Sequence, residues 1–218
     1  MKRLLLLPIL APSLAFAQDV TGRASVIDGD TLEIHGKRIR LHGIDAPESG
    51  QSCRTRDGKR WRCGQKAALA LSDKIGPRTV SCTRKSTDRY KRIVAKCTVS
   101  GEDLGEWLVT NGWAVAYYQY SYEYSRAEQG AKSARRGVWK GEFVKPWDWR
   151  RAKRMKAEEK AKRTGCRIKG NISRRGTRIY HLPGGKFYDR TRIDTSKGEL
   201  WFCTEAEAHA AGWRRSKQ

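Results

Sequence analysis

Short runs of alternating apolar and polar residues dominate the first half of the chain. They cover residues 20–44, interrupted by turn sequences at Asp28-Gly29-Asp30 and His35-Gly36-Lys37. Such alternation is typical of half-buried β-strands. Proline cannot join a strand ladder, so Pro47 should end the last of these runs. Two further runs predict two more strands, at 79–84 and 92–99.

Helical spacing of apolar residues appears between and after these strands. It predicts a helix over 65–75, a short helix over 103–110 that stops near Asn111-Gly112, and a third helix over 123–136. Strands and helices joined by short connections predict an α+β, β-rich fold. The specific expectation is a five-stranded OB-fold barrel with three helices.

The composition changes after residue 150. Residues 151–165 are densely basic and lack a clear apolar stripe, which predicts an exposed helix or linker. Beyond them, turn sequences separate short strands, and 204–211 is expected as a helix with Thr204 as its N-cap and Glu207 in capping-box position. The expected domains are a signal peptide at 1–17, an OB-fold domain at 18–150, a basic linker at 151–165 and a small carboxy-terminal module at 166–218.

The amino terminus has the pattern of an export signal. Lys2 and Arg3 precede an apolar run at 4–14 that is too short to span a bilayer, and Ala15-Phe16-Ala17 forms a small-x-small cleavage site. We therefore expect a secreted or periplasmic protein without a transmembrane segment, and an uncleaved anchor is the alternative.

Charge and cysteine content narrow the class of protein. The formal net charge of +23, from 46 Lys and Arg against 23 Asp and Glu, favours a polyanionic partner such as nucleic acid, an acidic membrane surface or a cell-wall polymer. Six cysteines without CxxC spacing favour disulfides in an oxidising compartment over a zinc site. The preferred pairing is 53–63, 82–97 and 166–203, although two other connectivities remain open among the first four.

A group of acidic residues is expected at one open end of the hairpin over 28–45. A turn around Gly36 would pair positions whose numbers sum to about 73, which places Asp28 and Asp30 opposite residues 45 and 43. Like charges gathered there need a cation or solvent to relieve them. Asp30 and Asp45, with Glu48 close behind, predict a site of hard oxygen ligands for calcium or magnesium. Asp28 alone is equally well explained as a turn residue.

Such a site suits phosphodiester hydrolysis when positive charge and an activated water are also present. Arg40 and Arg92 are candidates for the charge, because a guanidinium stays protonated and binds two phosphate oxygens at once. Glu48 is the candidate that orients or deprotonates the water. One difficulty is that Arg40 and Asp45 lie five positions apart, so they share a face only if the strand bends or ends before Asp45.

Three segments resemble the signature sequences of the staphylococcal nuclease family. They are VIDGDT at 26–31, RLHGIDAPE at 40–48 and TDRYKR at 87–92, and the resemblance covers about residues 20–150. It implies an OB-fold barrel with three helices and calcium-dependent hydrolysis of DNA and RNA that leaves 3′-phosphate ends.

The resemblance also implies roles for individual residues. By position, Asp30 and Asp45 are similar to the metal carboxylates, and Ala46, where some members have threonine, to a residue that lends its backbone carbonyl. Lys91 replaces a glycine that often precedes the catalytic arginine. The catalytic set implied is Arg40, Glu48 and Arg92. The substrate-binding set implied is Arg89, Tyr90, Tyr118 and Tyr120, whose aromatic faces would stack on a base without reading it.

Two other functions remain open at this point. The chain could be a non-catalytic OB-fold protein that binds single-stranded nucleic acid, which needs only the basic and aromatic surface. The module at 166–218 resembles a small module at the ends of some exported bacterial proteins, including nucleases, and is interpreted as a disulfide-closed accessory module that binds nucleic acid or an envelope polymer. A monomer is expected.

Overall fold

The computed structural model describes residues 19–88, 90–173 and 175–217, with the backbone but not the side chain of Ser196. The expected signal peptide at 1–17 and Arg89 lie outside the described residues. Within the described ranges, no helix combines the length and the apolar character needed to cross a membrane.

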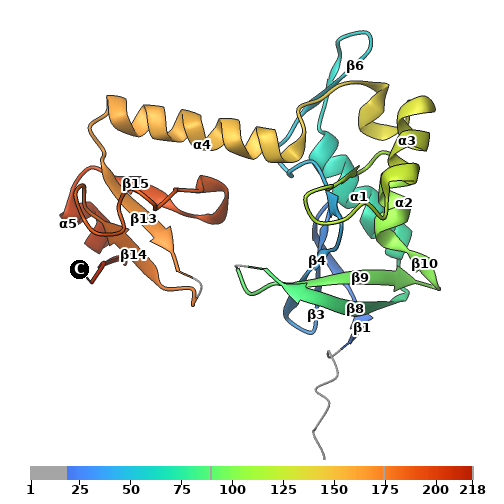
Figure 1. Cartoon of the computed structure of the whole chain (residues 1–218), viewed down its shortest axis with the longest axis horizontal. Coiled ribbons are helices and arrows are strands. Elements are labelled where there is room, and N and C mark those ends of the chain that lie inside the picture. Colours follow the sequence, from blue (N-terminus) through green and yellow to red (C-terminus); the bar gives the residue numbers. More distant parts are fainter. Residues whose placement is uncertain (1–18, 89, 174, 218) are drawn as a thin grey trace, which may run out of the picture.

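A curled sheet of seven strands forms the amino-terminal part of the chain (Figure 1). Its strands are β1 (Val20–Arg23), β2 (Ser25–Asp28), β3 (Thr31–Ile34), β4 (Lys37–Leu41), β8 (Thr79–Thr87), β9 (Ile93–Val99) and β10 (Glu102–Asp103). The strands β1 and β2 are two halves of one bent segment that pair with opposite sides of the sheet, β1 with β8 and β2 with β3. The segment therefore curls the sheet toward closure, which gives the expected α+β fold of the OB type.

The hairpin between β3 and β4 is tighter than the sequence pattern predicted. Thr31 pairs with Arg40 and Ile34 with Lys37, so paired positions sum to 71 rather than about 73. The physical reason is a two-residue turn in which His35 (φ 50°) and Gly36 (φ 71°) both adopt the left-handed conformation. The predicted pairing of Asp28 and Asp30 with residues 45 and 43 is therefore wrong.

Three helices pack against this sheet and bury its core (Figure 1). They are α1 (Cys63–Ile75), α2 (Leu104–Thr110) and α3 (Ser125–Ser133). The α2 helix begins as expected, because the Asp103 side chain accepts hydrogen bonds from the backbone N–H groups of Gly105 and Glu106. The core combines strand and helix residues, among them Leu32, Ile34, Ile39, Leu71, Ile75, Leu104 and Leu108.

Two small sheets lie beside the main one and shape the region around Glu48. One joins β5 (Ile44–Asp45) to β11 (Val115–Ala116). The other contains β6 (Cys53–Thr55), β7 (Arg60–Trp61) and β12 (Gly141–Glu142), which follows the short helix η1 (Gly137–Lys140). The disulfide between Cys53 and Cys63 ties β6 to the start of α1.

A long helix, α4 (Pro146–Arg163), leads from this region to the carboxy-terminal module (Figure 1). The basic segment 151–165 thus largely continues a helix that begins at Pro146. The module contains a four-stranded sheet, the short helix η2 (Thr195–Lys197) and α5 (Glu205–Ala210). Its strands are β13 (Ile168–Ile172), β14 (Arg178–His181), β15 (Leu200–Phe202) and β16 (Arg214–Arg215).

The three preferred disulfides are all present. Cys53 pairs with Cys63, Cys82 with Cys97 across β8 and β9, and Cys166 with Cys203 in the module. The module has its own small core, formed by Ile168, Tyr180, Phe202, Ala208 and Trp213. The domain boundaries drawn from the sequence stay an interpretation.

Candidate active site

The centre of the candidate site is Arg40, which lies between two buried aspartates. Its terminal nitrogen Nη2 is 2.8 Å from Oδ2 of Asp30 and 2.6 Å from Oδ1 of Asp45. The side chains of the aspartates are only 5% and 0% exposed, so the ion pairs are shielded from water. Asp30 also accepts hydrogen bonds from the Thr31 hydroxyl and from the backbone N–H of Ala46. The structure thus brings together Asp30, Arg40, Asp45 and Ala46.

A break in the chain after β4 allows Arg40 and Asp45 to share a face. The strand ends at Leu41, and Gly43 (φ 74°) turns the backbone before β5 begins at Ile44. Asp45 then pairs with Val115 of β11 instead of continuing β4. The condition set by strand alternation, that the strand must end before Asp45, is therefore met.

Glu48 lies on a constrained loop that follows β5. Its backbone N–H donates to the side-chain oxygen of Gln51 at 3.3 Å, and Gln51 is buried and donates to the carbonyl oxygen of Val144. On the other side, a Cβ atom at Gly64 would lie 1.7 Å from the carbonyl oxygen of Glu48, so this close approach requires glycine. The loop therefore holds the backbone of Glu48 in one place.

A third arginine, Arg150 of α4, connects Glu48 to the aspartates. Its guanidinium donates to Oε1 of Glu48 at 2.6 Å and to Oδ2 of Asp45 at 2.7 Å, and its side chain is 17% exposed. The start of α4 is docked by Trp147, whose ring stacks on Tyr117 with centroids 5.1 Å apart. Sequence analysis missed Arg150 and Tyr117. The available signal was the pair of tryptophans at 147 and 149, because aromatic residues at the start of a basic helix indicate that this end is buried.

These contacts set the charge states at the site. Burial alone would raise the pKa of Asp30, but the Arg40 guanidinium and several hydrogen bonds hold it below its usual value. Burial raises the pKa of Asp45, and the hydrogen bonds from Arg150 oppose that shift. Burial and the nearby Asp30 raise the pKa of Asp28 to about 7. The carboxylates raise the pKa of Arg40 and Arg150, despite burial, so both arginines stay charged.

Arg92 stands apart from this cluster. Its Nε atom donates to Oδ2 of Asp88 at 2.8 Å, and its guanidinium lies 5.6 Å from the centre of the Tyr90 ring. Among the described residues, no hydrogen bond or ion pair joins Arg92 to the carboxylates of the site. Lys91, which precedes it, adopts φ 64°, the left-handed conformation that glycine favours. The loop before Arg92 therefore keeps a glycine-like conformation without glycine.

The sequence model of the family described as "Staphylococcal nuclease homologue" matches residues 38–141. The succinoglycan biosynthesis protein ExoI of Rhizobium meliloti (strain 1021) is 40% identical over 129 residues, which cover 58% of this chain and 68% of that protein. An uncharacterized endonuclease of Haemophilus influenzae (strain ATCC 51907 / DSM 11121 / KW20 / Rd) is 33% identical over 138 residues, 60% of this chain and 72% of that protein. The chain belongs to the staphylococcal nuclease family.

Two further similarities extend this result. The micrococcal nuclease of Shigella flexneri is 32% identical over 148 residues, which cover 58% of this chain and 78% of that protein. A second family model, described as ArfC, matches residues 151–215. Arg150 falls between the two matched ranges, so the helix that carries it joins the staphylococcal nuclease domain to the second matched segment.

The tyrosines that the nuclease resemblance singled out differ in their surroundings. The hydroxyl of Tyr118 donates to the buried Glu128 at 2.8 Å, and burial together with Glu128 raises the pKa of Tyr118 to about 12. Tyr120 is 65% exposed. The hydroxyl of Tyr90 contacts Lys197 of the carboxy-terminal module. Tyr120 is therefore the most accessible of the three, whereas Tyr118 is held by α3.

The donor set fits the hard cation that this nuclease family implies. Asp30 and Asp45 offer carboxylate oxygens to either side of one guanidinium nitrogen, and the backbone of Ala46 is hydrogen-bonded to Asp30. Oxygen ligands of this kind suit calcium. In the part of the chain that the structure describes, no three histidine, cysteine, aspartate or glutamate side chains form a metal-binding group by themselves. A calcium ion would therefore need water or substrate oxygens as well.

Proposed function

We propose that this protein is an exported, calcium-dependent endonuclease that hydrolyses DNA and RNA with little sequence preference and leaves 3′-phosphate ends. The observation that carries the proposal is the cluster of Asp30, Arg40 and Asp45, with Glu48 linked to it through Arg150. Membership of the staphylococcal nuclease family supports the reaction class. Three disulfides support an oxidising compartment outside the cytoplasm.

Each residue of the site has a distinct role in this proposal. Asp30, Asp45 and the carbonyl of Ala46 would hold calcium, which supplies Lewis acidity at the scissile phosphate when bound. Arg40 and Arg92 bind non-bridging phosphate oxygens and stabilise the added negative charge in the transition state. For Arg92 this requires release from Asp88, with which it forms a partly exposed ion pair.

Glu48 acts on the attacking water. Its carboxylate accepts a proton from water as the water oxygen bonds to phosphorus. The bond between phosphorus and the 5′-oxygen then breaks, and the leaving oxygen takes up a proton, so that the products are a 3′-phosphate and a 5′-hydroxyl. Arg150 occupies Oε1 of Glu48, so the other carboxylate oxygen is the one that faces the water in this arrangement, and the ion pair lowers the basicity of Glu48 until Arg150 releases it.

Aromatic and basic residues explain the low sequence preference. Tyr120 is exposed close to Tyr117, with ring centroids 5.0 Å apart, and an exposed ring stacks on any base. Tyr90, Tyr118 and Arg89 complete the proposed substrate-binding set. Arginine contacts to phosphate are independent of base identity, so neither group of contacts selects a sequence.

The test is incubation of the disulfide-bonded protein with plasmid DNA and with RNA, in calcium or in chelator. We expect cleavage of both substrates in calcium only, and 3′ ends that a polymerase extends only after phosphatase treatment. Glu48→Gln serves as the matched inactive variant. If no cleavage occurred at any calcium concentration, the remaining function would be non-catalytic binding of single-stranded nucleic acid by an OB-fold protein.

A further inference from the structure

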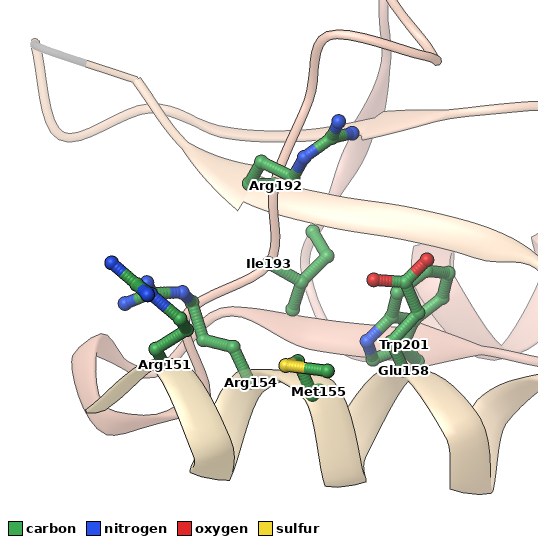
Figure 2. Close-up of a pocket in the computed structure, with 7 residues that line it drawn as sticks. All are labelled: Arg151, Arg154, Met155, Glu158, Arg192, Ile193 and Trp201. Carbon is green, nitrogen blue, oxygen red and sulfur yellow. The ribbon is translucent and has the colours of Figure 1, made fainter. Parts of the chain in front are cut away.

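A pocket of about 240 Å³ lies where α4 faces the carboxy-terminal module. From α4, Arg151 and Arg154 lie at one end of the pocket, Met155 in the middle and Glu158 at the other end (Figure 2). The module contributes Arg192, Ile193 and Trp201. Neither part of the chain forms this pocket alone, so it exists only because α4 holds the module in place.

Positive charge in the pocket exceeds negative charge. Three guanidinium groups line it, against the single carboxylate of Glu158, which already pairs with Lys162 at 3.2 Å. Arg151 has only a long contact of 3.8 Å with Asp148. Among residues 19–88, 90–173 and 175–217, no carboxylate forms an ion pair with Arg154. Figure 2 shows the guanidinium groups of Arg151 and Arg154 together at one end of the pocket, and that of Arg192 on the opposite side, where it donates to the backbone carbonyl oxygen of Asp189. A guanidinium without a carboxylate partner, as at Arg154, is suited to phosphate oxygens.

The positive charge of Arg192 affects a neighbouring lysine. Lys169 of β13 lies with its ammonium 5.7 Å from the centre of the Trp201 ring and donates to the carbonyl oxygen of Tyr188. Burial lowers the pKa of Lys169, and Arg192 lowers it further. An anion bound in the pocket would relieve this crowding of like charges.

The opposite walls of the pocket are apolar. Met155 and Ile193 face each other across it, with Trp201 beside them (Figure 2). Met155 is 64% exposed, although its side chain is a large apolar one. Apolar and aromatic walls next to guanidinium groups match a nucleotide, which has a flat base joined to a phosphate, better than they match a bare inorganic anion.

The pocket begins one residue beyond the active site. Arg150 reaches Glu48 and Asp45, and Arg151 and Arg154 follow on the same helix. Arg154 lies about 6 Å further along the helix axis than Arg150. A strand whose scissile phosphate lies at Glu48 would therefore reach the pocket with a nucleotide several positions from the scissile phosphate, beyond the reach of a dinucleotide.

The module also contacts the other side of the candidate site. The ammonium of Lys197 lies 3.8 Å from the centre of the Tyr90 ring, and the Tyr90 hydroxyl is its hydrogen-bond partner. Tyr90 precedes Arg92 by two positions and stacks near its guanidinium. The module thus adjoins the active site at α4 and at the loop before β9.

We infer that the pocket between α4 and the module is a second nucleic-acid-binding site, which holds one nucleotide of a single strand while another part of that strand occupies the active site. Arg154 binds its phosphate, Arg192 adds positive charge on the opposite side of the pocket, and the base covers Met155 (Figure 2). The inference rests on the proposed function for its choice of polyanion. With this site, the carboxy-terminal module contributes to the binding of long substrates.

Binding of fluorescent single strands in chelator tests the inference without cleavage. The probes are a dinucleotide, which occupies the active site only, and a strand of about 20 nucleotides, longer than the usual range for an OB fold. We expect Arg154→Glu and Arg192→Glu to weaken binding of the long strand by about tenfold and to reduce the salt dependence by about 0.7 per lost contact. Dinucleotide binding should stay unchanged.

Lys156→Glu is the matched control, because Lys156 lies on the same helix, is exposed and does not line the pocket. If Lys156→Glu lost as much affinity for the long strand as the pocket variants, the losses would reflect net charge alone, and the inference would be overturned. Met155→Gln keeps every charge and should weaken the long strand several-fold but not inorganic polyphosphate. If Met155→Gln weakened the long strand and inorganic polyphosphate equally, or if the unaltered protein bound these two ligands with equal affinity, the pocket would be a general anion site. Either result would contradict the nucleotide assignment.

Cleavage assays separate this inference from the proposed function. If Arg154 and Arg192 control binding of long strands but no cleavage occurs, the second site stands and the endonuclease proposal fails. If cleavage occurs in calcium while Arg154→Glu and Arg192→Glu bind and cut long strands like the unaltered protein, the endonuclease stands and the second site is refuted.

Discussion

Arg150 donates a hydrogen bond of 2.6 Å to Glu48, across 102 positions of the chain. The same guanidinium contacts both oxygens of Asp45, so an arginine side chain occupies the position next to the carboxylates that a metal cation could take. An ion at this site and Arg150 compete for the same oxygens. The helix that leads to the carboxy-terminal module is therefore linked by Arg150 to the carboxylates of the candidate site.

Arg150→Ala should destabilise the protein in chelator and much less in calcium. Asp45 is fully buried, and loss of the guanidinium leaves it with fewer donors, which costs about 1–3 kcal/mol of unfolding free energy. Calcium would supply the missing charge and offset the loss. Chemical denaturation of both proteins in chelator and in calcium measures the difference. Arg151→Ala is the neighbouring control, and equal losses in the two media for Arg150→Ala would contradict the competition.

Glu48→Gln and Arg92→Ala should each lower the cleavage rate by a factor of about 10² or more. The first removes the base that takes the water proton, and the second removes positive charge from the transition state. Neither side chain belongs to the hydrophobic core, so the melting temperature should change little. Initial rates on plasmid DNA, with thermal unfolding alongside, check both points. Unchanged turnover in either variant would remove that residue from the catalytic set.

Removal of the disulfide between Cys53 and Cys63 should impair activity as well as stability. The bond adjoins the loop that carries Glu48, since the Cys63 sulfur lies 3.5 Å from the carbonyl oxygen of Gln51. The double variant Cys53→Ser, Cys63→Ser should lose about 3 kcal/mol on the chain-entropy estimate. Activity per folded molecule should also fall.

The control for this experiment is the double variant Cys166→Ser, Cys203→Ser, whose bond lies in the module. It should lose stability but keep its rate on a dinucleotide substrate. If both double variants kept that rate, the loop around Glu48 would not depend on its disulfide.

Tyr118 and Tyr120 should respond differently to substitution. Tyr118→Phe removes the donor to Glu128 and should cost about 1–2 kcal/mol of stability with little effect on substrate affinity. Tyr120→Ala should leave stability unchanged and weaken single-strand binding by about 1–3 kcal/mol, since an exposed stacking surface is lost. Denaturation curves and oligonucleotide titrations measure the two effects. The opposite pattern would exchange the roles of the two tyrosines.

The stability of the module should decrease as pH falls below about 6.5. Burial, and then Lys169, lower the pKa of His181 from the usual 6.5, so the neutral ring favours the folded state. The contribution of the neutral His181 ring to stability is complete above the pKa of histidine in the unfolded chain. It is lost as pH falls through the lower pKa of His181 in the folded protein. Melting temperatures between pH 5 and 8 should show this fall, and His181→Gln should flatten it. An unchanged slope in the variant would assign the effect to another group.

Local patterns predicted most strands of the main sheet and the main helices, because these depend on neighbouring residues. The three disulfide pairs were also predicted correctly, although they join residues 10, 15 and 37 positions apart. Alternation also showed that Arg40 and Asp45 need a strand break, which Gly43 provides. The hairpin register was wrong by two positions, since the turn at His35 and Gly36 is tighter than turn composition alone indicates.

The contacts of Arg150 could not be predicted from local sequence patterns. Its contact with Asp45 spans 105 positions and depends on where α4 docks, which Trp147 and Tyr117 decide through a stacking contact. In a chain with 46 Lys and Arg, the tryptophans at 147 and 149 indicate which end of the helix is buried, but they do not identify Arg150 as the arginine that reaches the site. The ion pair between Arg92 and Asp88 joins residues four positions apart. Whether Arg92 contacts Asp88 or a phosphate depends on the presence of the ligand.

The uninterrupted helix α4 fixes the direction in which the carboxy-terminal module lies relative to the candidate active site. Each residue turns a helix by about 100° and advances it by about 1.5 Å. One residue inserted after Arg150 would rotate the module away from its present side, whereas four would restore nearly the same side about 6 Å further out. In the proposed two-site arrangement, the length of α4 thus sets which nucleotide, counted from the scissile phosphate, the second site can hold.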